Sequence, residues 1–158
     1  MTVVEICESL RESIKYSQKL RHSRKEWTNT IKKNLTQHAR KDGLFICTSG
    51  VKEADCGEWL YDLVVLKYRK DAELIESAVL ALESEWDSDE QSILEDFQKL
   101  LLSNAEIKVM LYFKNHLMQE KMQKMIVHYS RSSGIFILAH LPAENSELDI
   151  VTVSGNVA

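Results

Sequence analysis

Hydrophobic and polar residues alternate along this chain with two different periods, and each period predicts a different kind of element. Over residues 2 to 20, apolar side chains recur every three to four positions or at multiples of that spacing, which is typical of a helix. The same spacing runs over residues 23 to 41, where Ser23 and Glu26 form a capping-box pattern and Gly43 follows as a stop. We therefore expect helix over both ranges, as one long helix or as two.

Short apolar runs then predict three strands. The expected strands cover residues 44 to 48, 58 to 67 and 75 to 86. The second run is apolar on both faces, which is typical of a central strand covered on both sides. A short polar connection separates the second strand from the third, so we expect these two strands to form a hairpin.

The rest of the chain alternates helical and strand patterns. The expected elements are a helix over residues 90 to 103, a strand over 107 to 113, a helix over 115 to 130, a strand over 134 to 141 and a last strand over 148 to 153. Two strands joined through a helix by short connections imply a right-handed crossover and a parallel pair. The pattern therefore predicts an α/β fold with a central mixed sheet flanked by helices.

The length of 158 residues suits one domain, and no repeat or linker divides the chain. Within it we distinguish a basic helical segment (1–41), a core (44–113) and a C-terminal helix–strand–strand extension (114–158). The first segment carries ten Lys or Arg against four acids, whereas the remaining residues carry ten against twenty. This asymmetry fits a protein that holds phosphates with one part and a metal ion with another. A solvated helix face explains the basic segment equally well.

The cysteines and the apolar runs predict where the protein works. Cys7, Cys47 and Cys56 are an odd number without metal-ligand spacing, so we expect reduced thiols in a cytoplasmic protein. No apolar run is long enough to span a bilayer, and charged residues interrupt the N-terminus, unlike a signal peptide. The sequence therefore predicts a cytoplasmic location and no membrane partner.

Three acids stand out within the strand patterns. Glu83 and Glu85 are two residues apart on one expected strand, so their side chains point to the same face. Asp62 interrupts the apolar run of the preceding strand. A hairpin centred between Asp71 and Glu73 would place Asp62 opposite Glu83, with Cβ atoms roughly 5 Å apart. Acids clustered on a sheet are costly unless a cation or a proton holds them together.

This arrangement resembles the restriction endonuclease-like, or PD-(D/E)XK, nuclease superfamily over residues 23 to 113. The common core of that superfamily runs α-β-β-β-α-β. It carries an Asp on the second strand and a Glu or Asp, followed two residues later by Lys, on the third. Asp62 and Glu83 match the two acids. The resemblance implies that they bind Mg²⁺ or Mn²⁺, with Glu85 completing the site or binding a second ion, and that the substrate is DNA or RNA.

The sequence departs from the superfamily at the catalytic lysine, because Glu85 stands at that position. Members are known in which the lysine comes from the following helix, and Lys99 is the one basic residue of the helix expected here. The resemblance therefore implies that Asp62, Glu83, Glu85 and Lys99 are catalytic, with Lys99 neutralising the scissile phosphate.

Three functional hypotheses follow. The first is a metal-dependent nuclease that works as a homodimer or beside another subunit. The second is a catalytically inactive nuclease-fold domain that serves as a nucleic-acid-binding, protein-binding or regulatory module; the acid at position 85 and the net charge of −4 favour it. The third is a small α/β protein of unrelated function, which applies if the hairpin register is wrong.

Each candidate residue also has a structural explanation. Asp62 is a strand acid paired with a nearby lysine in that explanation, and Glu83 and Glu85 line the solvent-facing end of a strand. Lys99 is then an ion-pair partner of Asp96 or Glu95 on its own helix.

Overall fold

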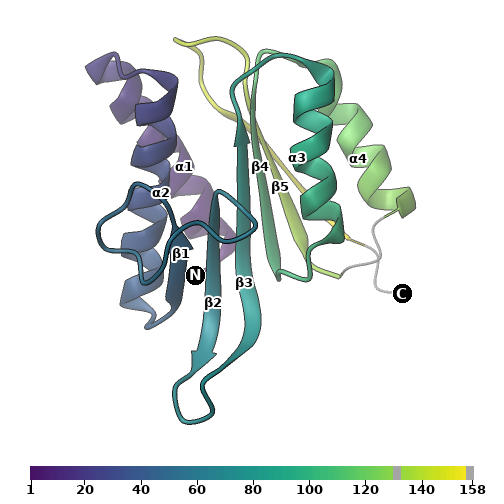
Figure 1. The fold of residues 1–158 in the computed structure, drawn as a ribbon. Coiled ribbons are helices and arrows are strands. Elements are labelled where there is room, and N and C mark those ends of the chain that lie inside the picture. Colours follow the sequence, from purple (N-terminus) through teal and green to yellow (C-terminus); the bar gives the residue numbers. More distant parts are fainter. Residues whose placement is uncertain (130–132, 156–158) are drawn as a thin grey trace. The chain divides into compact units, whose positions relative to one another are not determined.

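A computed structural model describes residues 1–129 and 133–155, which form a mixed α/β structure with four helices and six strands (Figure 1). The chain divides into two compact units, Met1–Val79 and Leu80–Ala158, and strand β3 contributes to both. The strands follow the order β1-β2-β3-β4-β5-β6 in a mixed sheet. This confirms the predicted α/β class and the predicted sequence of elements.

The first unit begins with two helices that pack against each other, α1 (Val3–Leu20) and α2 (Arg24–Lys41). The predicted capping box is present, because Glu26 N donates to Ser23 Oγ at 3.4 Å and Ser23 N donates to Glu26 Oε2 at 2.6 Å. Arg21, with φ 53°, ends α1 in the left-handed conformation. The helical segment that the sequence left open is therefore two helices, each with its own cap.

The strands of the first unit are β1 (Phe45–Thr48), β2 (Leu63–Arg69) and the first half of β3 (Leu74–Glu85). Strands β1 and β2 are antiparallel, with Phe45 opposite Leu66. Figure 1 shows β2 and β3 running in opposite directions through a hairpin turn. The prediction that the second strand begins at residue 58 is wrong: Leu60 has φ 66°, which breaks an extended strand, and Asp62 lies just before β2.

The prediction of reduced thiols is wrong for two of the three cysteines. Cys47 on β1 and Cys56 form a disulfide, whereas the buried Cys7 is a free thiol. The segment after β1 folds back beside the strand, so that Thr48 N donates to Cys56 O at 3.1 Å and Cys56 N donates to Ile46 O at 3.2 Å. This reversal brings the two sulfurs together, which their separation along the chain did not indicate. The cysteines therefore no longer argue for a cytoplasmic location.

The second unit contains the end of β3 followed by α3 (Glu90–Leu102), β4 (Ile107–Phe113), α4 (Leu117–Tyr129), β5 (Ile135–Leu141) and β6 (Asp149–Ser154). Strands β3, β4 and β5 are parallel, which confirms the predicted crossover through α3, and β6 is antiparallel to β5. Both helices cover the same face of β4 and β5: Phe97 of α3 contacts Phe136, and Tyr112 donates to Gln119 of α4.

Packing on this face places the helix that carries Lys99. Ile93, Phe97 and Leu100 of α3 are fully buried, so the helix is fixed by a stripe of three apolar side chains. Asp89 caps its first turn by accepting a hydrogen bond from Ser92 N at 3.0 Å. Within residues 1–129 and 133–155, no helix is long and apolar enough to cross a membrane.

Candidate functional site

The second unit brings Glu83 and Lys99 together. Glu83 lies on β3 opposite Met110 of β4 and is buried, with 3% of its surface exposed. Lys99 lies next to the buried stripe of α3, and its Nζ is 3.3 Å from Glu83 Oε1 and 2.6 Å from Asp96 Oδ1. The predicted relocated lysine thus contacts the predicted acid. Its contact with Asp96 is also the helix ion pair that the sequence suggested as an alternative.

The charges around Lys99 keep it an ammonium group. The hydrogen bond to Asp96 raises the pKa of Lys99 above its ordinary value, and the negative charge of Glu83 raises it further against the opposing effect of burial. The lysine side chain is about half exposed, so its positive end is accessible from solvent while it contacts a buried carboxylate. The Lys99 ammonium group is therefore positively charged and reachable from solvent beside the Glu83 carboxylate.

Glu85 takes a different role at the end of β3. Its Oε1 accepts a hydrogen bond from Asp87 N at 2.7 Å, and Asp87 Oδ1 accepts one from Asp89 N at 3.2 Å. These bonds shape the turn that leads into α3. As the second residue after Glu83 on the same strand, Glu85 points to the same face of the sheet.

Asp62 lies in the first unit, where Lys32 of α2 contacts it. Lys32 Nζ is 3.7 Å from Asp62 Oδ1 and 3.5 Å from Glu58 Oε2, and 4% of the lysine is exposed. Ser49 donates to Glu58 Oε2 at 2.7 Å, which closes the cluster. The structure thus shows the lysine partner that the structural explanation required. The predicted position of Asp62 opposite Glu83 stays a prediction.

Sequence reasoning missed Lys32 because nothing local marks it. It follows Ile31 of the buried helix stripe, and the segment from Ser49 to Asp62 buries it by folding over the helix. A lysine next to an apolar stripe usually extends its charge into solvent. Only the long-range fold of that segment shows that this one does not.

Metal binding can be judged from the donor chemistry. In the described parts of the chain, no group of three or more His, Cys, Asp and Glu side chains is arranged to hold a metal ion. Mg²⁺ commonly takes only one or two carboxylates, with waters and substrate phosphates as its other ligands. Glu83 and Glu85 supply two carboxylates on one face of β3, so the residues of the second unit fit that requirement in number and kind.

A second missed group is Lys108 on β4. It interrupts an apolar run just as Asp62 does, and it is fully buried. Its Nζ donates to Ala105 O at 2.6 Å and Ser133 O at 3.0 Å, and it lies 4.9 Å from the centre of the Phe136 ring. Burial lowers the pKa of Lys108 to about 8. Its hydrogen bonds go to backbone carbonyls, which hold the side chain within the packing of the second unit.

The same face of the second unit carries a buried aromatic pair. Tyr112 and His140 lie opposite each other on β4 and β5, with ring centroids 4.9 Å apart in a stacked arrangement. Burial lowers the pKa of His140 and raises that of Tyr112, so both groups stay neutral near pH 7. They belong to the packing around the site.

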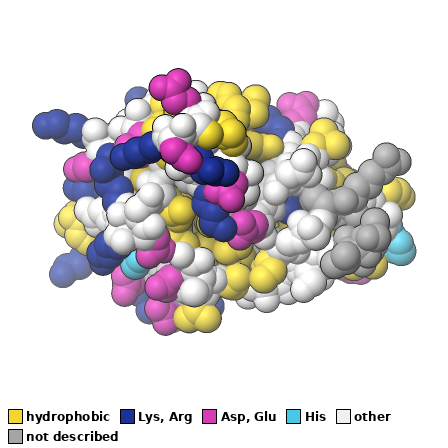
Figure 2. All heavy atoms as spheres, turned by 90° about the horizontal axis from the view of Figure 1, so that it is seen from below, with side chains coloured by type: hydrophobic (Ala, Val, Ile, Leu, Met, Phe, Trp, Pro, Cys, Tyr) yellow, Lys and Arg dark blue, Asp and Glu magenta, His cyan; other side chains and the backbone are white. Residues whose placement is uncertain are grey.

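Basic and acidic side chains are interspersed on the face that Figure 2 shows, without a broad field of one sign. No family model, no curated protein and no solved structure matches this chain in comparisons with known proteins.

Proposed function

We propose that this chain is a metal-dependent, nuclease-like hydrolase of the restriction endonuclease-like type that cleaves phosphodiester bonds in DNA or RNA. The observation that carries the proposal is the contact between Lys99 Nζ and Glu83 Oε1 at 3.3 Å. The superfamily resemblance requires a lysine beside the acid of the third strand. In this chain a lysine reaches that acid from α3, although position 85 holds a glutamate.

Each residue has a distinct role in this proposal. Glu83 and Glu85 would hold Mg²⁺ or Mn²⁺, and the bound ion would supply an activated water and charge stabilisation. Lys99 neutralises charge that develops on the scissile phosphate. The raised pKa of Lys99 suits this role because the side chain stays positive throughout the physiological range. Asp96 holds the lysine in position by its hydrogen bond.

The test compares Lys99→Met with Lys124→Met. Both variants remove one helix lysine that pairs with a carboxylate of its own helix, but Lys124 pairs with Glu120 on the exposed side of α4. Cleavage of labelled single-stranded and duplex substrates with Mn²⁺ is measured for both, with circular dichroism to confirm folding. Removal of a charge-stabilising donor typically lowers the rate about 100-fold or more. We expect that loss in Lys99→Met and wild-type cleavage in Lys124→Met.

Equal cleavage by wild type and Lys99→Met would refute the role of Lys99. Metal binding is tested separately by calorimetry with Mn²⁺, where Glu83→Gln should weaken binding and Glu106→Gln, a change on the loop before β4, should not. No heat of binding to the wild type at millimolar Mn²⁺ would refute the metal site.

The second candidate is a catalytically inactive nuclease-fold module that binds nucleic acid or protein, as an accessory subunit or within a homodimer. The hydrogen bond from Asp87 N to Glu85 favours it, because it gives the glutamate at the motif position a structural role. Binding of nucleic acid without cleavage by the wild type would support this candidate. Cleavage gained in Glu85→Lys would then show that only the lysine was missing.

A further inference from the structure

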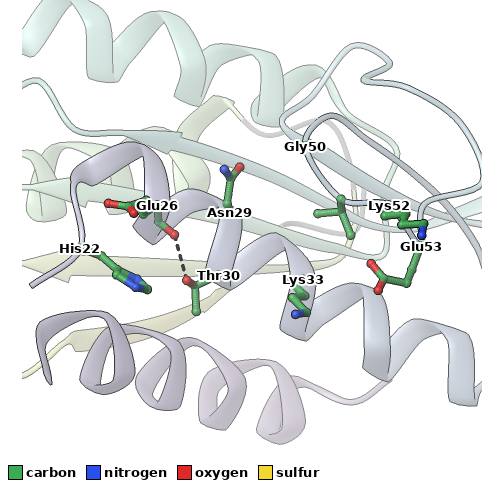
Figure 3. Close-up of a pocket in the computed structure, with 9 residues that line it drawn as sticks. His22, Glu26, Asn29, Thr30, Lys33, Gly50, Lys52 and Glu53 are labelled. Atoms are coloured by element: carbon green, nitrogen blue, oxygen red, sulfur yellow. Dashed lines mark hydrogen bonds between the residues drawn. The ribbon is translucent and has the colours of Figure 1, made fainter. Parts of the chain in front are cut away.

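Two adjoining cavities form a polar groove inside the first unit. One has a volume of about 600 Å³ and the other about 370 Å³, and both are lined by His22, Thr30 and Lys33. The groove is bounded by α1, by α2 and by the turn around Gly50 to Glu53 (Figure 3). These volumes lie in the range of about 300–1,000 Å³ that small-molecule sites occupy. Glu83 and Lys99 are not among the residues that line the groove.

An exposed aromatic ring lines the larger cavity. Tyr16 of α1 is 54% exposed, and its ring lies edge-on to His22, with centroids 5.8 Å apart and planes at 77°. The two rings are nearly perpendicular, and about half of the tyrosine surface is exposed to solvent. An aromatic ring held in this way in a polar groove is a platform on which a planar base can stack.

Amide side chains and Lys33 line the groove beside the ring. Asn34 and Gln37 of α2 line the larger cavity and Asn29 lines the smaller one, so donors and acceptors for a base edge are present in both. Lys33 lies where the two cavities meet. Figure 3 shows its side chain extending from α2 on the same side of the helix as Thr30.

The charges of the groove limit what it can bind. Lys33 and Lys52 are balanced by acids, of which Glu26 is already engaged by Ser23 through bonds of 2.6 and 2.7 Å. A balanced groove does not attract a long duplex by charge, because duplex binding depends on the neutralisation of many phosphates. The stacking ring, the amides and a central lysine favour a short ligand with a planar base and few phosphates.

We propose that this groove binds one or two nucleotides of a single-stranded nucleic acid. A base stacks on Tyr16, Gln37 hydrogen-bonds its edge, and Lys33 contacts a phosphate, whereas Asn34 Nδ2 already donates to Ser13 Oγ at 2.8 Å. This inference rests on the proposed function, since it names single-stranded nucleic acid as the class that the hydrolase recognises. Binding in the groove and cleavage at Lys99 involve different residues, so each can be measured without the other.

The experiment measures fluorescence anisotropy of a short labelled oligothymidylate in EDTA, where metal-dependent cleavage is absent. Tyr16→Ala is compared with Tyr129→Ala, which removes another exposed tyrosine from α4. Lys33→Ala is compared with Lys25→Ala, which removes an exposed lysine of α2 that does not line the groove. Loss of one base stack weakens binding about tenfold to a hundredfold. We expect that loss in Tyr16→Ala, a smaller loss in Lys33→Ala and wild-type binding in both controls.

Salt dependence gives a second, independent measure. One or two phosphate contacts correspond to a slope of log K against log salt of about −0.7 to −1.4 for a single strand. The inference is overturned if the wild type does not bind the oligonucleotide or binds a duplex of the same sequence more tightly. It is also overturned if the salt slope is much steeper, or if Tyr129→Ala loses as much affinity as Tyr16→Ala. Oligonucleotide binding that needs Tyr16, in a chain that cleaves nothing, would refute the proposed hydrolase and support the groove. Cleavage that needs Lys99 but not Tyr16, measured at limiting substrate, would support the proposed hydrolase and refute the groove.

Discussion

Lys108 makes the stability of the second unit depend on pH, because its side chain is fully buried and burial lowers the pKa of its ammonium group. Its ammonium donates to two backbone carbonyls, Ala105 O and Ser133 O, and lies against the ring of Phe136. Burial lowers its pKa from the ordinary value of 10.5 to about 8. The perturbation we consider is Lys108→Met, which keeps an unbranched side chain and removes the charge.

The direction in which the unfolding free energy changes with pH follows from the protons that each state binds. Between pH 8 and 10.5 the unfolded chain holds the Lys108 proton and the folded chain has released it, so the folded state gains stability as the pH rises. Over the whole window the difference corresponds to about 3 kcal/mol of unfolding free energy, of which up to about 2.5 kcal/mol accrues between pH 7 and 10. The carbonyl hydrogen bonds and the Phe136 ring favour the ammonium, so these magnitudes are upper limits.

The assay is urea unfolding of the wild type and Lys108→Met at intervals from about pH 7 to 10. The free energy of unfolding of the wild type should rise relative to that of the variant across this range. Measurements stop at pH 10 because burial raises the pKa of Tyr112, and the unfolded chain gains stability above that pH when its tyrosine ionises. Lys19→Met, which removes an exposed lysine of α1, is the control and should keep the wild-type rise.

A pH profile that is the same in wild type and Lys108→Met would show that the Lys108 proton is bound equally in both states. That result would refute the argument from burial. If the unfolding free energy of the wild type falls relative to that of the variant between pH 8 and 10, the pKa of Lys108 is raised in the folded chain rather than lowered.

Two further predictions concern the first unit. Cys47→Ala combined with Cys56→Ala opens a loop of ten residues, so the free energy of unfolding measured in urea should fall by about 3 kcal/mol. A reducing agent should produce most of that fall in the wild type. An unchanged free energy of unfolding in both experiments would refute a stabilising crosslink. Gly50 has φ 74°, and an added Cβ would meet Asn29 Oδ1 at 2.9 Å, so Gly50→Ala should lower the free energy of unfolding by about 1–3 kcal/mol. Gly57→Ala, where a Cβ meets nothing within 4 Å, is the matched control; an equal loss in both variants would contradict the strain at Gly50.

The parts of this protein that the sequence predicted are those set by interactions a few residues apart. Ser23 and Glu26 cap a helix through bonds across three positions, and the stripe of Ile93, Phe97 and Leu100 follows from helical periodicity. The parallel pairing of β3 with β4 follows from the helical crossover that joins them. Lys99 could be proposed for the same reason, since it is the one basic residue on the helix that the crossover places over β3.

Tertiary structure decided which charged groups are buried and what neutralises them. Lys32, Asp62 and Glu58 come together because the segment after β1 folds back over α2, and the same reversal forms the disulfide of Cys47. Lys108 is held by carbonyls from two loops that are far apart in the sequence. A buried charge needs partners on several sides, and those partners come from chain reversals that no local period records. The sequence by itself therefore determined the elements and the acids to examine, whereas the packing of distant segments determined which cation each acid meets.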